Sequence, residues 1–110
     1  MKKSSSTYKE IKDFIEANYT REEEKIKEIG IEDFNDYIVD DVLGNEAFSN
    51  EVDEFFYTLS ICLVMKKMNI KDKYFIDSLK ELLMYYNEGK YNEYIDESEK
   101  KIINEDLKLI

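Results

Sequence analysis

The stretch EVDEFFYTLSICLVMKK, which runs from Glu51 to Lys67, decides the fold of this chain. Its first half is amphipathic, because its large apolar side chains recur at the spacing of one helix face. These side chains are Val52, Phe55, Phe56 and Leu59. Its second half is apolar on nearly every side, which is typical of a helix enclosed by its neighbours. The sequence therefore predicts a central buried helix here, capped by Ser49 or Asn50.

Helical spacing continues on both sides of this stretch, and the chain contains no proline. We expect a first helix that begins near Ser6 or Thr7, and further helices at about 20–30, 32–43, 72–87 and from 98 onward. The expected caps and stops are the Thr20–Glu23 capping box, the N-caps Asp72 and Ser98, and the glycines Gly30, Gly44 and Gly89. The predicted fold is an all-α, compact single-domain bundle of about five to six helices over residues 1–110, with residues 1–6 as a flexible basic tail.

Negative charge is concentrated in one segment. The chain has 26 acidic and 16 basic residues, a net charge of −10. Ten of those acids lie between Glu28 and Met65, where there is no lysine or arginine. A field of one sign attracts cationic partners and repels nucleic acid and anionic membranes. The charge pattern therefore predicts a basic protein as partner, with no binding to nucleic acid or membranes.

Several kinds of chemistry lack the residues they need. The chain has no histidine, three isolated glycines and one cysteine, Cys62, which we interpret as a small buried hydrophobe. Asp33-x-Asn35-Asp36 lacks the central glycine and final glutamate of a calcium loop. We expect no enzyme, no cofactor and no metal. The N-terminus lacks the apolar run of a signal peptide, and the apolar run from Leu59 to Met65 is too short to span a bilayer, which predicts a cytoplasmic protein.

The predicted helix at 32–43 has a row of carboxylates along one face. At 100° per residue, Asp33, Asp36 and Asp40 fall within about 60° of each other, opposite the apolar positions. Tyr37 flanks this row, and Asp41 lies just beyond Tyr37. Like charges one turn apart destabilise a helix by roughly 0.2–0.5 kcal/mol per pair, and anions near its C-terminus are unfavourable.

This arrangement has two interpretations. Acids in a first helical turn favour the helix dipole, so Glu32, Asp33, Glu51, Asp53 and Glu54 fit a solvated surface equally well. The repulsion between like charges and the helix dipole together disfavour Asp36, Asp40 and Asp41, which indicates that these residues have a binding role. The neighbouring Tyr37 is a residue type that is common in interfaces. The candidate partner-binding residues are Asp33, Asp36, Tyr37, Asp40, Asp41, Asp53, Glu54 and Tyr57, the last of which equally suits the core.

The carboxy-terminal half carries a resemblance to a known family. It combines the acid-led apolar helix EVDEFFYTLSICLVMKKMNI at 51–70, a second helix FIDSLKELL at 75–83, the turn NEGKYNEY at 87–94 and a charged last helix. This pattern resembles the small acidic helical immunity proteins of bacterial polymorphic toxin systems, whether contact-dependent or secreted. Those families often have tryptophan after the turn and arginine in the tail, where this chain has tyrosines and Lys100-Lys101. The resemblance implies neutralisation, by tight binding, of a toxin domain encoded by a neighbouring gene, often a basic nuclease.

Two other functions stay open. A nucleic-acid-mimicking inhibitor would use the same acidic face against a host enzyme. An all-α magnesium-dependent nucleotide pyrophosphatase would need carboxylate pairs one turn apart on two helices, and Glu51-x-x-Glu54 and Glu93-x-x-Asp96 have that spacing. Such pairs arise by chance in an acidic chain, and no basic group is placed to hold a triphosphate.

Overall fold

The computed structural model describes residues 7–37 and 51–110. These residues form six α-helices and, within the described ranges, no strand. The helices are α1 Tyr8–Arg21, α2 Glu23–Ile29, α3 Ile31–Tyr37, α4 Glu51–Lys67, α5 Lys73–Asn87 and α6 Glu97–Leu107. The all-α prediction of five to six helices is confirmed. The expected tail at 1–6, the second half of the predicted helix at 32–43, the stop at Gly44 and the caps Ser49 and Asn50 lie outside the described residues.

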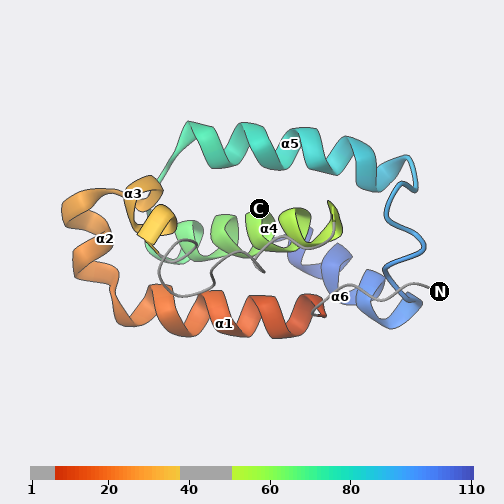
Figure 1. Cartoon of the computed structure of the whole chain (residues 1–110), viewed down its shortest axis with the longest axis horizontal. Coiled ribbons are helices and arrows are strands. Elements are labelled where there is room, and N and C mark those ends of the chain that lie inside the picture. Colours follow the sequence, from red (N-terminus) through yellow and green to blue (C-terminus); the bar gives the residue numbers. More distant parts are fainter. Residues whose placement is uncertain (1–6, 38–50) are drawn as a thin grey trace.

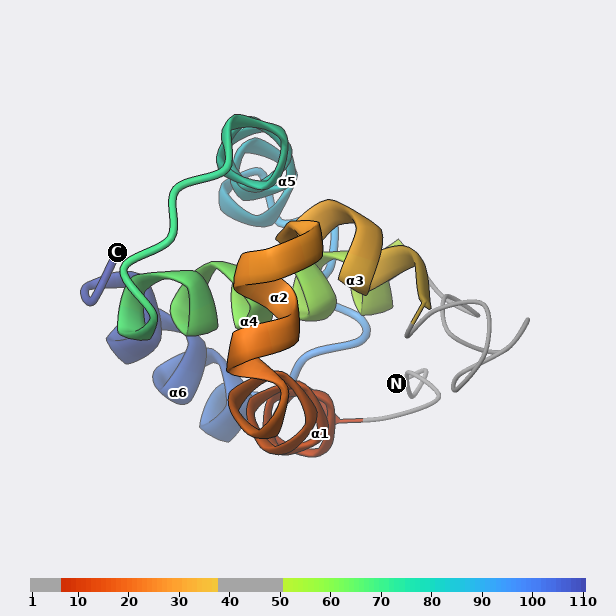
Figure 2. The same ribbon diagram turned by 90° about the vertical axis from the view of Figure 1, so that its left-hand side faces the viewer.

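Helix α4 runs through the middle of the bundle. Helices α1 and α5 pack on opposite sides of it, and Figure 2 shows α6 and α3 on its two remaining sides (Figures 1 and 2). From Val52 to Met65, every side chain except that of Glu54 is buried. The prediction of a central buried helix is therefore confirmed. Helix α4 also lines two cavities, one shared with α1 and α6 and the other with α3 and α5.

Aromatic rings join the outer layers to α4. The Phe56 ring lies 5.5 Å from the Tyr8 ring of α1. The neighbouring Phe55 ring stacks against Tyr86 of α5 at 5.1 Å and against Tyr91, just beyond α5, at 5.6 Å. Such pairs add about 0.5–1.5 kcal/mol each to the stabilisation from apolar burial. The amphipathic first half of α4 thus anchors the helices on both sides.

Most helix ends follow the sequence, with two exceptions. Thr7 begins α1 in a capping box with Glu10, and Asp72 caps α5, as predicted. The Thr20–Glu23 capping box is wrong, because α1 continues to Arg21 and α2 has no side-chain cap.

The predicted cap of the last helix, Ser98, is also wrong. The cap of α6 is Asp96, whose Oδ1 accepts hydrogen bonds from the Glu99 amide at 2.8 Å and the Ser98 hydroxyl at 2.7 Å. Ser98 lies within the first turn of α6, so its hydroxyl donates to the capping carboxylate and does not itself cap the helix.

A buried polar network ties the two ends of the described chain together. The Tyr8 hydroxyl donates to Oδ2 of Asp106 at 2.6 Å, and Lys12 Nζ donates to the same oxygen at 2.9 Å. The Tyr8 amide also donates to Glu99 at 3.2 Å. Burial, followed by the hydrogen bond to Asp106, raises the pKa of Tyr8 well above its usual range. The network holds α6 against α1 through the buried Tyr8 hydroxyl and Asp106, together with the half-buried Lys12 and Glu99.

We expect Asp106→Ala to reduce the free energy of unfolding by about 2–3 kcal/mol, because it leaves the buried Tyr8 hydroxyl without its acceptor. Denaturant unfolding followed by circular dichroism measures this loss. The control is Asp13→Ala, which breaks the exposed Lys9–Asp13 pair (3.1 Å) and should cost about 0.5 kcal/mol or less. Equal losses in the two variants would contradict a structural role for the network.

Candidate partner-binding surface

Gly30 sets the direction of α3. This residue ends α2 with φ of +95°, a conformation that side-chain-bearing residues rarely adopt. Its amide donates to the Ile26 carbonyl at 2.8 Å, and its carbonyl accepts from the Phe34 amide at 3.1 Å. Gly30 therefore forms the last hydrogen bond of α2 and the first hydrogen bond of α3. It places Ile31 and Phe34 in the core, where the Phe34 ring meets Tyr19 edge-on at 4.9 Å.

The opposite face of α3 carries exposed carboxylates. Glu32, Asp33 and Asp36 are all exposed, as the helical spacing predicts for the last two. Glu54 is the exposed residue of α4 between Val52 and Met65. We call these four residues the acidic surface. None of them forms an ion pair with another residue of the described ranges 7–37 and 51–110.

Carboxylates crowd together at one edge of the acidic surface. The Glu32 side chain meets that of Asp72, the residue that caps α5. The neighbouring Asp72 carboxyl group, followed by the charges of Asp33 and Asp36, raises the pKa of Glu32. A carboxyl group takes up a proton more readily when other negative charges surround it. The edge therefore carries mutual repulsion that a bound cation would relieve.

Tyr37 lies at the margin of this surface with 40 % of its area exposed. Its ring stacks on Phe34, with centroids 6.1 Å apart, and Lys25 Nζ of α2 lies 4.7 Å from its centre. The spacing of acids and bases in the sequence places no cation beside α3. The structure brings Lys25 there because α2 folds back against α3 at Gly30. The contacts with Phe34 and Lys25 therefore fix the position of the Tyr37 ring.

A groove of about 230 Å³ lies between α3, α4 and α5. It is lined by Asn35, Asp36, Glu54, Tyr57, Thr58, Ile61, Tyr74, Phe75 and Ser78. The groove brings together three of the predicted residues, Asp36, Glu54 and Tyr57, which belong to two separate helices. Sequence reasoning missed Tyr74, which is 61 % exposed on α5. An aromatic residue outside the apolar stripe of an amphipathic helix is the signal that could have identified it.

The remaining predicted residues lie elsewhere. Asp53 is fully buried and Tyr57 is 5 % exposed, because α4 is enclosed by its neighbours. Burial, followed by the charge of Asp53, raises the pKa of Tyr57 to about 12. Tyr57 lines the groove, whereas Asp53 has no exposed surface, and we leave Asp53 out of the candidate contact surface. Asp40 and Asp41 lie outside the described residues.

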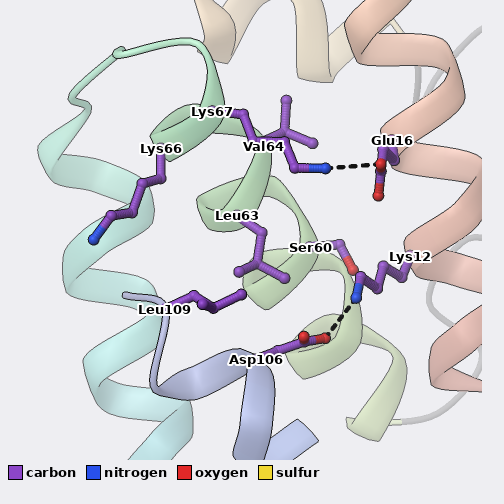
Figure 3. A pocket seen from close by; sticks show the side chains of 9 residues that line it. All are labelled: Lys12, Glu16, Ser60, Leu63, Val64, Lys66, Lys67, Asp106 and Leu109. Carbon is purple, nitrogen blue, oxygen red and sulfur yellow. Dashed lines mark hydrogen bonds and ion pairs between the residues drawn. The ribbon is translucent and has the colours of Figure 1, made fainter. Parts of the chain in front are cut away.

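A larger cavity of about 460 Å³ opens between α1, α4 and α6 (Figure 3). Two ion pairs cross its walls, Lys67–Glu16 at 2.7 Å and Lys12–Asp106 at 2.9 Å. Its lining has three lysines and two carboxylates, and its apolar part includes Leu63, Val64 and Leu109. This cavity therefore lacks the excess of negative charge found at the acidic surface, and a cationic partner would prefer the latter.

The carboxylate pairs considered for magnesium do not form the expected arrangement. Glu93 lies in the turn after α5 and Asp96 is the N-cap of α6, so this pair is not on a helix. Across the described residues, no group of three or more histidine, cysteine or acidic side chains is close enough to hold a metal ion. Within the same residues, no helix has the length and apolar character needed to cross a membrane.

A scan against protein-family models and searches of curated proteins and of solved structures found no match to this chain.

We expect Glu32→Gln to raise the midpoint of thermal unfolding near neutral pH. The pKa of Glu32 in the folded chain lies above its ordinary value of 4.5, so the folded state binds this proton more tightly than the unfolded state. Below the ordinary value the group is protonated in both states and imposes no penalty. The penalty appears as pH rises through the folded pKa. The gain from the substitution should therefore grow as pH rises from the ordinary value of 4.5 through the folded pKa, and should then level off.

Glu81→Gln on α5 is the matched control, since it removes the same charge from an exposed position away from α3. Calorimetric scans across this pH range compare the two variants with the native chain. The same pH dependence in both variants would show that the effect comes from the net charge of the protein and not from the carboxylates beside Glu32.

Proposed function

We propose that this chain is an immunity protein that binds a basic toxin domain encoded by a neighbouring gene and neutralises it by occlusion. The observation that carries the proposal is the acidic surface, whose four carboxylates have no ion-pair partners among the described residues and adjoin a groove with aromatic walls. A surface with this charge and shape suits a site that normally holds a phosphate backbone with lysine or arginine. The resemblance of residues 49–110 to immunity proteins supports the same function.

The proposed mechanism separates approach from retention. The carboxylates draw a cationic domain toward the acidic surface and accelerate its association. Aromatic contacts then slow its release, and Tyr37 and Tyr74 are the exposed rings placed for this role. Asp40 and Asp41, three and four residues beyond the end of α3 in the sequence, remain proposed contacts. The proposed mechanism involves no catalysis and no cofactor, and the proposed location of the protein is the cytoplasm.

Calorimetric titration of the chain into the toxin domain of the adjacent gene, at two salt concentrations, tests this function. We expect 1:1 binding in the nanomolar range that weakens as salt rises. The absence of binding would remove the immunity function for that pair of proteins. A host nucleic-acid enzyme captured through the acidic surface would then favour the nucleic-acid mimic.

We expect the triple variant Asp33→Asn, Asp36→Asn, Glu54→Gln to associate with the toxin domain about tenfold more slowly at low salt, because electrostatic steering is lost. Its rate should also depend less on ionic strength. Stopped-flow mixing measures both effects.

A second triple variant, Asp13→Asn, Glu88→Gln, Glu105→Gln, is the control for net charge. It neutralises three exposed acids that lie on neither α3 nor α4, namely one on α1, one on α6 and the C-cap residue of α5. An equal fall in the association rate for both triple variants would mean that overall charge, rather than this surface, steers the partner.

A further inference from the structure

The size of the groove between α3, α4 and α5 limits what it can hold. Its volume of about 230 Å³ is below the range of about 300–1,000 Å³ that is usual for small-molecule pockets. Its walls come from three helices that are far apart in the sequence, around residues 35, 57 and 75. A site of this size on a proposed binding surface suits a single long side chain of a partner rather than a free metabolite.

The negative charge of the groove favours a positively charged side chain. Asp36 and Glu54 are its charged lining residues, and both are negative. Both are exposed, and neither forms an ion pair with another residue of the described ranges. The two carboxylates lie on different helices, so a cation between them would contact α3 and α4 together. The occupant should therefore be a lysine or an arginine.

The aromatic walls favour arginine. Tyr57, Tyr74 and Phe75 line the groove, and the Tyr74 ring meets Phe75 edge-on at 5.2 Å. Phe75 is buried, so it provides a firm support for the exposed Tyr74 ring. A guanidinium group is flat and weakly hydrated, stacks on aromatic rings and donates two parallel hydrogen bonds to a carboxylate. An ammonium group is a compact, strongly hydrated charge that loses more hydration on entering such a site.

We propose that this groove receives an arginine side chain of the partner, with the guanidinium donating to Asp36 and Glu54 and lying against Tyr74. The inference rests on the proposed function, since the arginine belongs to the toxin domain. It specifies an anchor residue at the interface, which the acidic surface alone does not.

The probes for this site are L-argininamide and L-lysinamide, which carry the same charged groups apart from the side-chain head. Each is titrated into the ¹⁵N-labelled chain and followed by amide chemical shifts. We expect argininamide to cause saturable shifts around residues 35–36, 54–61 and 74–78. It should bind roughly threefold to fivefold more tightly than lysinamide, because a guanidinium group stacks flat on Tyr74 and donates two parallel hydrogen bonds, which an ammonium group cannot do. Equal affinities, or shifts centred elsewhere, would overturn the proposal.

Two pairs of variants separate the contribution of the Tyr74 ring from that of the Glu54 carboxylate. Tyr74→Leu should remove the preference for argininamide over lysinamide, whereas Tyr85→Leu, on the same helix but outside the groove lining, should keep it. Glu54→Gln should weaken both probes, whereas Glu81→Gln should not. Tyr74 and Glu54 are exposed, so the fold tolerates these changes. If Tyr74→Leu still bound argininamide more tightly than lysinamide, the proposed contact between the guanidinium and the Tyr74 ring would be wrong.

The two proposals fail separately, because the probes bind this chain without the toxin domain. If the toxin domain binds in a salt-dependent manner while argininamide shows no preference, the arginine groove is wrong and the proposed function stands. If argininamide binds as expected while the toxin domain does not, the proposed function is wrong and the groove belongs to another arginine-bearing partner.

Discussion

Burial of α4 on every side is the constraint on which the rest of the structure depends. Between Val52 and Met65 only Glu54 reaches the surface, so α1 and α5 must turn their apolar faces toward this helix. Polar groups on α4 must also be satisfied inside the protein, and Ser60 does so by donating to the Phe56 carbonyl at 2.7 Å. Each outer helix has one apolar face, which leaves its charged residues at the surface.

The acidic surface follows from this arrangement, and it carries a cost. Helix α3 buries Ile31 and Phe34, so its carboxylates are left facing solvent beside Asp72 and repel one another. On the other side of α4, carboxylates and lysines pair across the cavity of Figure 3. The described part of the molecule is therefore polarised, with ion-paired carboxylates at the cavity between α1, α4 and α6 and carboxylates without ion pairs around α3. A binding partner with positive charge is the physical reason we offer for keeping that imbalance.

Much of the fold was predictable because its causes are local. Apolar spacing identified each helix found in residues 7–37 and 51–110, and the caps Thr7 and Asp72 were predicted correctly from neighbouring residues. Local reasoning failed where two residues compete for the same role, as Asp96 and Ser98 do at the start of α6. Within the site, helical geometry alone was enough to place Asp33 and Asp36 on one exposed face.

The sequence by itself determined the helices, the central place of α4 and the acidic row on α3, since each depends on residues within a few turns of one another. Only the tertiary structure set Lys25 against Tyr37 and buried Asp53. It also joined Glu54 to Tyr74 in one groove. These relations depend on the direction in which helices far apart in the sequence approach each other. That direction is decided by the packing of whole faces against α4, which no local spacing records.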